Sequence, residues 1–304
     1  MNAGSSESEQ VLVSGERQRL MVAHLVANKF FRKELLLANV GWPIERLRER
    51  GATEVLDTDS PWKMGYAPDS FTRLTDHLRE RGFDFRTLIR AGLAEWTEEG
   101  TAVDVFRDQL MLLARDERLD PVGFVGVSQG DQPGFTPSPT TLIHRPSNAL
   151  VGIGEQLDLL TDGAMVVIVN DPLDAMAVEK LSRMSGEKWA GIPLCGSLMS
   201  SAQARTLYRY TATDTVVVAL NSDQEWRRTA VAASPDLSYF YRRVRAVEIP
   251  DGHTATSLLQ THDGAQQLHD AMLSTRPLED DARRRQHLAD VESDPTPATS
   301  GPSL

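Results

Sequence analysis

The fold of this chain is constrained most by two similar segments. Each begins with an apolar run, continues with polar residues and then becomes amphipathic. They are MVVIVNDPLDAMAVEKL (165–181) and TVVVALNSDQEWRRTA (215–230). The β-branched run at the start of each segment predicts a buried strand, and the apolar residues at helical spacing that follow predict a helix. A strand, a helix and another strand of this kind are typical of a parallel βαβ unit, so the chain is predicted to be an α/β protein.

Polar side chains follow both predicted strands. In open parallel sheets, ligands bind outside the carboxyl ends of the strands, which would bring Asn170, Asp171 and Asp174 near Asn221 and Asp223. Carboxylates gathered at such an edge are oxygen ligands that suit magnesium. Acids are also favoured at helix N-termini, where they accept hydrogen bonds and meet the positive end of the helix dipole. The spacing alone leaves the metal site and the capping role equally open.

The rest of the chain is predicted to add an α+β N-terminal subdomain and short C-terminal helices to this sheet. Helices are expected from Glu16 to Ala38 and from Pro43 to Gly51, because proline suits a first helical turn and glycine a helix end. Four strands should alternate with helices from Met165 to Pro250. The predicted divisions are a disordered tail (1–15), a helical and mixed α/β subdomain (16–150), a parallel-sheet domain (151–262), a helical extension (263–291) and a disordered tail (292–304).

Four other segments stand in a recognisable order along the chain. They are WKMGYAPDSFTRL (62–74), PSPTTLIH (137–144), LCGSLMSSAQARTLYRY (194–210) and VRAVEIPDGHTATSLL (244–259). With the two strand segments, they resemble the catalytic core of DnaG-type bacterial DNA primases, whose TOPRIM domain has one strand ending in Glu-Gly and another ending in Asp-x-Asp. The resemblance covers residues 40–260 and implies a TOPRIM-like sheet that acts in DNA replication.

In such an enzyme, carboxylates hold divalent ions that bridge the incoming nucleotide's phosphates and steady the attacking 3′-hydroxyl. This chain departs from that pattern, because Asn170, Asp171 and Asn221 stand at the catalytic positions, and only Asp174 and Asp223 keep the family's acids as metal ligands. Asparagine is neutral, and one unit charge about 4 Å from another is worth roughly 4 kcal/mol at an effective dielectric near 20. We therefore expect a degenerate site whose binding of magnesium or manganese is weak or absent.

The formal charge of −11 does not favour nucleic acid, since proteins that bind it usually show a basic footprint. A local basic surface is still predicted in the first third of the chain. Its arginines are Arg46, Arg48, Arg50, Arg73, Arg79, Arg81, Arg86 and Arg90. The resemblance assigns Arg107 to a groove for template or nucleotide, and Arg115 extends that surface. The alternative is that most of these arginines pair with neighbouring acids on solvated helix faces.

Other chemistries are less well supported. The single cysteine, Cys195, excludes an internal disulfide and a cysteine-based zinc site, and it is expected in a buried strand. GVSQG (126–130) matches the nucleophile elbow of α/β-hydrolases, with Ser128 as the nucleophile, but the prolines after it oppose the required helix. There is no signal peptide and no run of 18 apolar residues, so a cytoplasmic protein without membrane contacts is expected.

Three functions follow as hypotheses. The first is a primase-like TOPRIM protein with impaired catalysis, which binds nucleic acid or nucleotides during replication of a chromosome or a mobile element. The second is an active DNA-directed RNA primase, a nucleotidyltransferase that uses the reduced acid set with magnesium. The third is a protein-interaction module, which the acidic charge would suit. The resemblance implies single-stranded DNA, nucleotides and replication proteins as partners.

Overall fold

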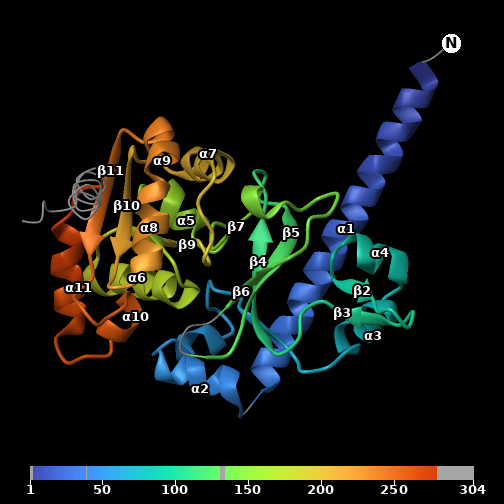
Figure 1. Ribbon diagram of the computed structural model, residues 1–304, viewed down its shortest axis with the longest axis horizontal. Coiled ribbons are helices and arrows are strands. Elements are labelled where there is room, and N and C mark those ends of the chain that lie inside the picture. Colours follow the sequence, from blue (N-terminus) through green and yellow to red (C-terminus); the bar gives the residue numbers. More distant parts are fainter. Residues whose placement is uncertain (1–2, 39, 131–133, 279–304) are drawn as a thin grey trace, which may run out of the picture.

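The protein is described by a computed structural model, which covers residues 3–38, 40–130 and 134–278, with the backbone alone for residues 3–13. It has an N-terminal part (residues 3–151) built on an antiparallel sheet and a C-terminal part (residues 157–278) built on a mostly parallel sheet. Figure 1 shows the two sheets side by side. The long first helix, α1 (Ala3–Leu37), crosses the N-terminal part and projects beyond it.

Helix α1 begins earlier than predicted and runs through residues that the sequence assigned to a flexible tail. Gly15 does not end the helix, because an isolated glycine in a helix interior costs only about 1 kcal/mol relative to alanine. Farther along, Leu20, Ala23, Ala27 and Phe31 are buried at helical spacing. This stripe packs α1 against the antiparallel sheet, which it contacts through β1 and β5.

The N-terminal sheet has the strand order β1-β4-β5-β6, with β7 also paired to β4, and all of its pairs are antiparallel. Its strands are β1 (Gly65–Ala67), β4 (Gln109–Arg115), β5 (Pro121–Val127), β6 (Phe135–Pro137) and β7 (Leu150–Val151). A separate hairpin joins β2 (Ala94–Trp96) and β3 (Ala102–Asp104). The helices beside these strands are α2 (Trp42–Glu49), η1 (Thr53–Leu56), α3 (Arg73–Arg79), α4 (Phe85–Arg90) and η2 (Pro146–Asn148).

The C-terminal sheet has the strand order β12-β11-β10-β8-β9. Four of its strands are parallel, as the sequence predicted: β8 (Met165–Val169), β9 (Trp189–Pro193), β10 (Thr215–Leu220) and β11 (Arg243–Glu248). The short β12 (Arg276–Pro277) pairs antiparallel with β11. The α/β class predicted from the alternation of strands and helices is therefore confirmed.

Helices cover both faces of the parallel sheet, which explains why its strands are apolar on both sides. Val167 and Val217 pack into one core, whereas Val166 and Val216 pack into a second core on the opposite face. The first face carries α6 (Pro172–Ser185), α10 (Ala255–Leu258) and α11 (Gly264–Leu273); the second carries α5 (Leu157–Thr161), α7 (Ser201–Tyr210), α8 (Gln224–Ala232) and α9 (Ser234–Phe240). The first core also contains the buried residues of α1 and α2, so it joins the two parts.

Of the predicted helical extension over residues 263–291, the structure describes residues 263–278. Helix α11 covers residues 264–273, and the chain then forms β12 instead of a further helix. Residues 279–304, which include the remainder of that extension and the predicted tail, lie outside the described residues. Among the described helices, none is both long and apolar enough to cross a membrane.

Candidate functional site

The polar residues that follow β8 and β10 lie at one edge of the parallel sheet. The two strands are direct neighbours, with Val216 opposite Val166 and Val218 opposite Ile168. Their carboxyl ends therefore bring the segment from Asn170 beside the segment from Asn221, as the sequence predicted.

Asn170 holds the loop that follows β9. Its side-chain Oδ1 accepts a hydrogen bond from the Gly196 N–H (2.8 Å), and its backbone carbonyl accepts one from the Cys195 N–H (2.9 Å). Cys195 itself lies just past β9 with φ at 51°, in a left-handed turn and not inside the strand that the sequence predicted for it. Burial raises the pKa of its thiol, which keeps the side chain protonated.

Asp171 caps the N-terminus of α6. Its Oδ1 accepts a hydrogen bond from the Leu173 N–H (2.7 Å), and its Oδ2 lies 3.9 Å from Nη2 of Arg46 on α2. Burial and the nearby Asp174 raise the pKa of Asp171, and the guanidinium groups of Arg50 and Arg46 oppose that rise. The carboxylate is thus engaged by a helix end on one side and by an arginine on the other.

Asp174 is buried, and it joins α6 to α10. Its Oδ1 accepts hydrogen bonds from the N–H (2.8 Å) and the hydroxyl (2.5 Å) of Thr256, and it lies 4.0 Å from Nη2 of Arg50. Thr256 was not among the predicted site residues, although the segment that contains it, 244–259, contributed to the resemblance. The hydroxyl and the backbone N–H of Thr256 both donate to one oxygen of Asp174, so this carboxylate helps to hold α10 against α6.

Asp223 and Asn221 organise the start of α8. One oxygen of Asp223 accepts hydrogen bonds from the backbone N–H groups of Glu225 (2.8 Å) and Trp226 (3.2 Å), while Asn221 Oδ1 accepts one from the Asp223 N–H (3.0 Å). Asp223 is therefore the N-cap of α8. These contacts are those of the capping role that the spacing had left open.

Whether these residues can bind a divalent ion depends on how many oxygen ligands they bring together. Magnesium requires several oxygen ligands in near-octahedral geometry. Across residues 3–38, 40–130 and 134–278, no group of three or more histidine, cysteine, aspartate or glutamate side chains is placed to hold a metal ion together. Because no such group forms there and Asn170 and Asn221 are neutral, the residues present do not fit the two-metal site of the resemblance.

Arg107 lies on the N-terminal part, where its guanidinium carbon is 4.5 Å from the centre of the Phe71 ring. Phe71 is 65 % exposed, so the pair presents a flat cationic and aromatic surface to solvent.

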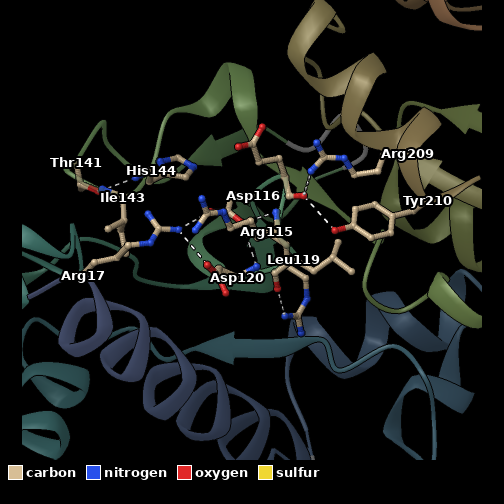
Figure 2. Close-up of polar contacts among 12 residues, drawn as sticks. Arg17, Arg115, Asp116, Leu119, Asp120, Thr141, Ile143, His144, Arg209 and Tyr210 are labelled. Carbon is tan, nitrogen blue, oxygen red and sulfur yellow. Dashed lines mark hydrogen bonds and ion pairs between the residues drawn. The ribbon is translucent and has the colours of Figure 1, made fainter. Parts of the chain in front are cut away.

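Arg115 has a different environment, shown in Figure 2. Its Nη1 donates to the Leu119 carbonyl (2.8 Å) inside the turn between β4 and β5. A Cβ on Gly154 would lie 2.3 Å from Nε of Arg115, so the glycine allows the backbone to pack directly on the guanidinium. The absence of a side chain at Gly154 is therefore explained by this close approach.

The turn that encloses Arg115 also links the two parts of the molecule. Arg17 of α1 pairs with Asp116 (2.6 Å) and with Asp120 (3.0 Å), as Figure 2 shows. On the other side, the carbonyl of Glu117 accepts hydrogen bonds from Arg209 (3.3 Å) and from the Tyr210 hydroxyl (3.0 Å), both on α7. These contacts hold the turn between α1 and α7, and the charge that they balance is that of Arg17.

Other arginines of the first third also pair with acids. Arg73 pairs with Glu34 (2.8 Å), and Arg90 pairs with Glu16. These pairs agree with the alternative that the sequence had left open for most of the arginines.

Ser128 does not occupy a nucleophile elbow. Its backbone N–H donates to the Gly134 carbonyl (3.0 Å), and its Oγ accepts from the Gly134 N–H (2.8 Å). The segment connects β5 to the antiparallel β6, whereas an elbow needs a strand followed by a helix.

The chain is similar in sequence to bacterial DNA primases. The family described as the DNA primase catalytic core, N-terminal domain, matches residues 30–156. DNA primase from Streptomyces coelicolor is 28 % identical over 247 residues, which cover 78 % of this chain and 37 % of that protein. DNA primase from Geobacillus stearothermophilus is 26 % identical over 255 residues, covering 82 % of this chain and 40 % of the relative. The chain thus spans about two fifths of the length of these curated relatives.

Solved structures share the fold. The RNA polymerase domain of Mycobacterium tuberculosis primase DnaG has a TM-score of 0.73 and 23 % identity, with 91 % of each chain covered. A DnaG primase catalytic domain bound to single-stranded DNA has a TM-score of 0.70 and 24 % identity, covering 87 % of this chain and 84 % of that one. At this identity, the structural likeness concerns the fold alone.

Proposed function

Because this chain carries a DnaG-type primase catalytic core, we propose that it binds single-stranded nucleic acid in DNA replication without synthesising primers itself. The observation that carries the proposal is the engagement of the remaining acids. Asp171 and Asp223 cap helices, and Asp174 is held by Thr256. Carboxylates used in this way keep the fold intact but do not assemble the ion-binding set that nucleotidyl transfer needs.

Binding to a single strand is assigned to the exposed ring of Phe71 and the half-buried Arg107 beside it. Every nucleic acid base has a flat face that stacks on an aromatic ring, and an arginine beside the ring adds attraction to phosphate. One structural relative is a DnaG primase catalytic domain bound to single-stranded DNA, which supports this choice of ligand. Nucleotides and replication proteins are proposed as further partners on the same similarity.

The net charge of −11 bears on how tight this binding can be. Few phosphates are neutralised by such a chain, so the salt dependence of binding should be shallow, and stacking should supply most of the affinity.

The proposal is tested by fluorescence anisotropy with labelled single-stranded DNA at several salt concentrations. We expect Phe71→Leu to weaken binding by about tenfold or more, since base–aromatic stacking is worth roughly 1–3 kcal/mol per base. Trp96→Leu is the matched control, because Trp96 is also an exposed aromatic residue of the N-terminal part, at 54 % exposed. Equal binding by the natural chain, Phe71→Leu and Trp96→Leu would show that Phe71 is not part of the binding surface.

The proposal that the chain does not synthesise primers is tested by a primer-synthesis assay on the same DNA, with labelled ribonucleotides and either magnesium or manganese. We expect no product from the natural chain. A product that Asp223→Ala abolishes would contradict the proposal and favour an active primase with a reduced acid set. Absence of any DNA binding would instead favour a protein-interaction module. The variant Asn170→Glu/Asn221→Asp, which restores the acids of the resemblance, shows whether those two positions limit the chemistry.

A further inference from the structure

Arg46 in the last turn of α2 and Arg50, the C-cap of that helix, face two acids at the start of α6, namely the N-cap Asp171 and the first-turn Asp174. Arg46 Nη2 lies 3.9 Å from Asp171 Oδ2, and these side chains are only 11 % and 13 % exposed. Arg50 Nη2 lies 4.0 Å from Asp174 Oδ1, with the side chains 24 % and 8 % exposed. Each acid therefore has a guanidinium opposite it in a place largely removed from solvent.

These guanidinium groups are held in position by the rest of the fold. Helix α2 buries Ile44 and Leu47 in the core that joins the two parts, which anchors the helix that carries Arg46. Arg46 Nη1 also donates to the carbonyl of Gly130, in the connection between β5 and β6. The arginine thus links the N-terminal sheet to the acidic edge of the C-terminal sheet, and packing fixes its placement.

We propose that the guanidinium of Arg46 takes the place of a divalent cation at this edge and closes it to magnesium and manganese. An arginine side chain stays protonated at any pH at which the protein is folded, and it can donate hydrogen bonds but cannot ligate a metal. Its charge meets the need of Asp171 for a positive partner, while Arg50 does the same for Asp174. A divalent ion that entered would meet two fixed cations at short range and low solvent exposure.

The neutral residues at this edge agree with such an arrangement. A divalent ion is usually held by several carboxylates, whereas a single guanidinium balances one. With Arg46 paired to Asp171 and Arg50 to Asp174, further acids at Asn170 and Asn221 would add negative charge without a partner. This inference rests on the proposed function in one respect, namely that the site carries out no catalysis. Its test uses no nucleic acid, so a failure of the inference can be told apart from a failure of the proposed function.

Titration of the full chain with manganese, followed by the electron paramagnetic resonance signal of the free ion, tests the inference. We expect no saturable binding by the natural protein up to millimolar concentrations. Arg46→Met should bind manganese at least about tenfold more tightly, with a dissociation constant on the order of 1 mM, because Asp171 is left without its partner. Arg48→Met is the matched control, since Arg48 is exposed on the same helix and its loss changes the net charge equally.

The double variant Arg46→Met/Asp171→Asn should lose the acquired binding, which would identify Asp171 as the released ligand. Saturable binding by the natural chain that Asp171→Asn or Asp223→Asn abolishes would overturn the inference, as would a folded Arg46→Met protein that binds no better than Arg48→Met. Circular dichroism reports whether Arg46→Met folds. If it does not, the titration of the natural chain still decides, because tight binding there contradicts a site closed to divalent ions.

Discussion

At the scale of single residues, two buried histidines stand at the contact between α1 and the antiparallel sheet. His24 is fully buried, its Nδ1 lies 2.9 Å from the Leu20 carbonyl, and its ring centre lies 5.7 Å from that of Phe124. Burial lowers the pKa of His24 to about 4, and burial also lowers that of His144, whose Nδ1 contacts the Pro139 carbonyl. Both side chains are therefore neutral core groups at physiological pH.

The pKa of His24 predicts a pH dependence of stability. In the unfolded chain this group binds a proton near pH 6.5, whereas in the folded protein it does so only near pH 4. Between these values the unfolded state holds more protons, so the free energy of unfolding falls as the pH falls from 6.5 to 4, by about 3 kcal/mol from this group. Urea unfolding at pH 7, 5.5 and 4 measures it.

In His24→Leu, the fall in the free energy of unfolding between pH 6.5 and pH 4 should be smaller than in the natural chain by about 3 kcal/mol, because the unfolded state then has no extra proton to bind at this position. His262→Leu is the control, since the His262 side chain is 98 % exposed and should leave the profile unchanged. Parallel profiles for the natural chain and His24→Leu would show that burial of this histidine does not set the acid sensitivity.

At the scale of elements, the close approach of α1 to β1 decides how the N-terminal part packs. A Cβ on Gly65 would lie 2.5 Å from Cβ of Phe31 and 2.8 Å from the backbone nitrogen of Arg32. Helix and strand therefore touch through their backbones, and a side chain at this position would have to displace the helix itself. Glycine is required at Gly65 for space and not for its backbone conformation.

Two glycine substitutions on this pair of elements should change stability in opposite directions. Gly65→Ala is expected to lower the free energy of unfolding by about 1–3 kcal/mol, since overpacking forces the backbone of α1 to shift. Gly15→Ala should raise it by up to about 1 kcal/mol, because nothing lies within 4 Å of the added methyl group and alanine favours a helix. Thermal unfolding measures both, and equal shifts of the same sign would contradict the close approach.

At the scale of the whole molecule, one core extends from the N-terminal part into the C-terminal part. It contains Leu47 of α2, Val55 of η1, Met176 of α6 and Val217 of β10. The turn between β4 and β5 adds polar contacts to α1 and α7 (Figure 2). A shared core makes the stability of each sheet depend on the other, and it holds Arg46 against Asp171.

This shared core predicts that the two sheets unfold together. Leu47→Ala is expected to cost about 2–5 kcal/mol, because it leaves a cavity beneath α2. Hydrogen exchange should then show protection falling by a similar free energy in β4 and in β10, although Leu47 belongs to neither strand. The exposed neighbour Arg48→Ala should change stability by less than about 0.5 kcal/mol. Loss of protection in β4 alone would mean that the two parts unfold independently.

Much of the architecture could be predicted from local patterns. The parallel strands β8, β9, β10 and β11 were predicted because buried strands alternate with helical spacing between Met165 and Pro250. The early start of α1 and the short β12 were not, since a helix without breakers extends by weak propensities and a two-residue strand leaves almost no periodic signal.

The parallel strands β8 to β11, the helices between them and the sheet edge at which Asp171 and Asp223 lie could be read from the sequence, because they follow from hydrophobic periodicity and from capping by near neighbours. The contacts that those acids make depend on the tertiary structure. Arg46 and Thr256 reach Asp171 and Asp174 from distant segments of the chain, and their approach depends on how α2 and α10 pack against α6. Whether an acid meets a guanidinium or a metal ion is a matter of long-range packing, which local spacing cannot specify.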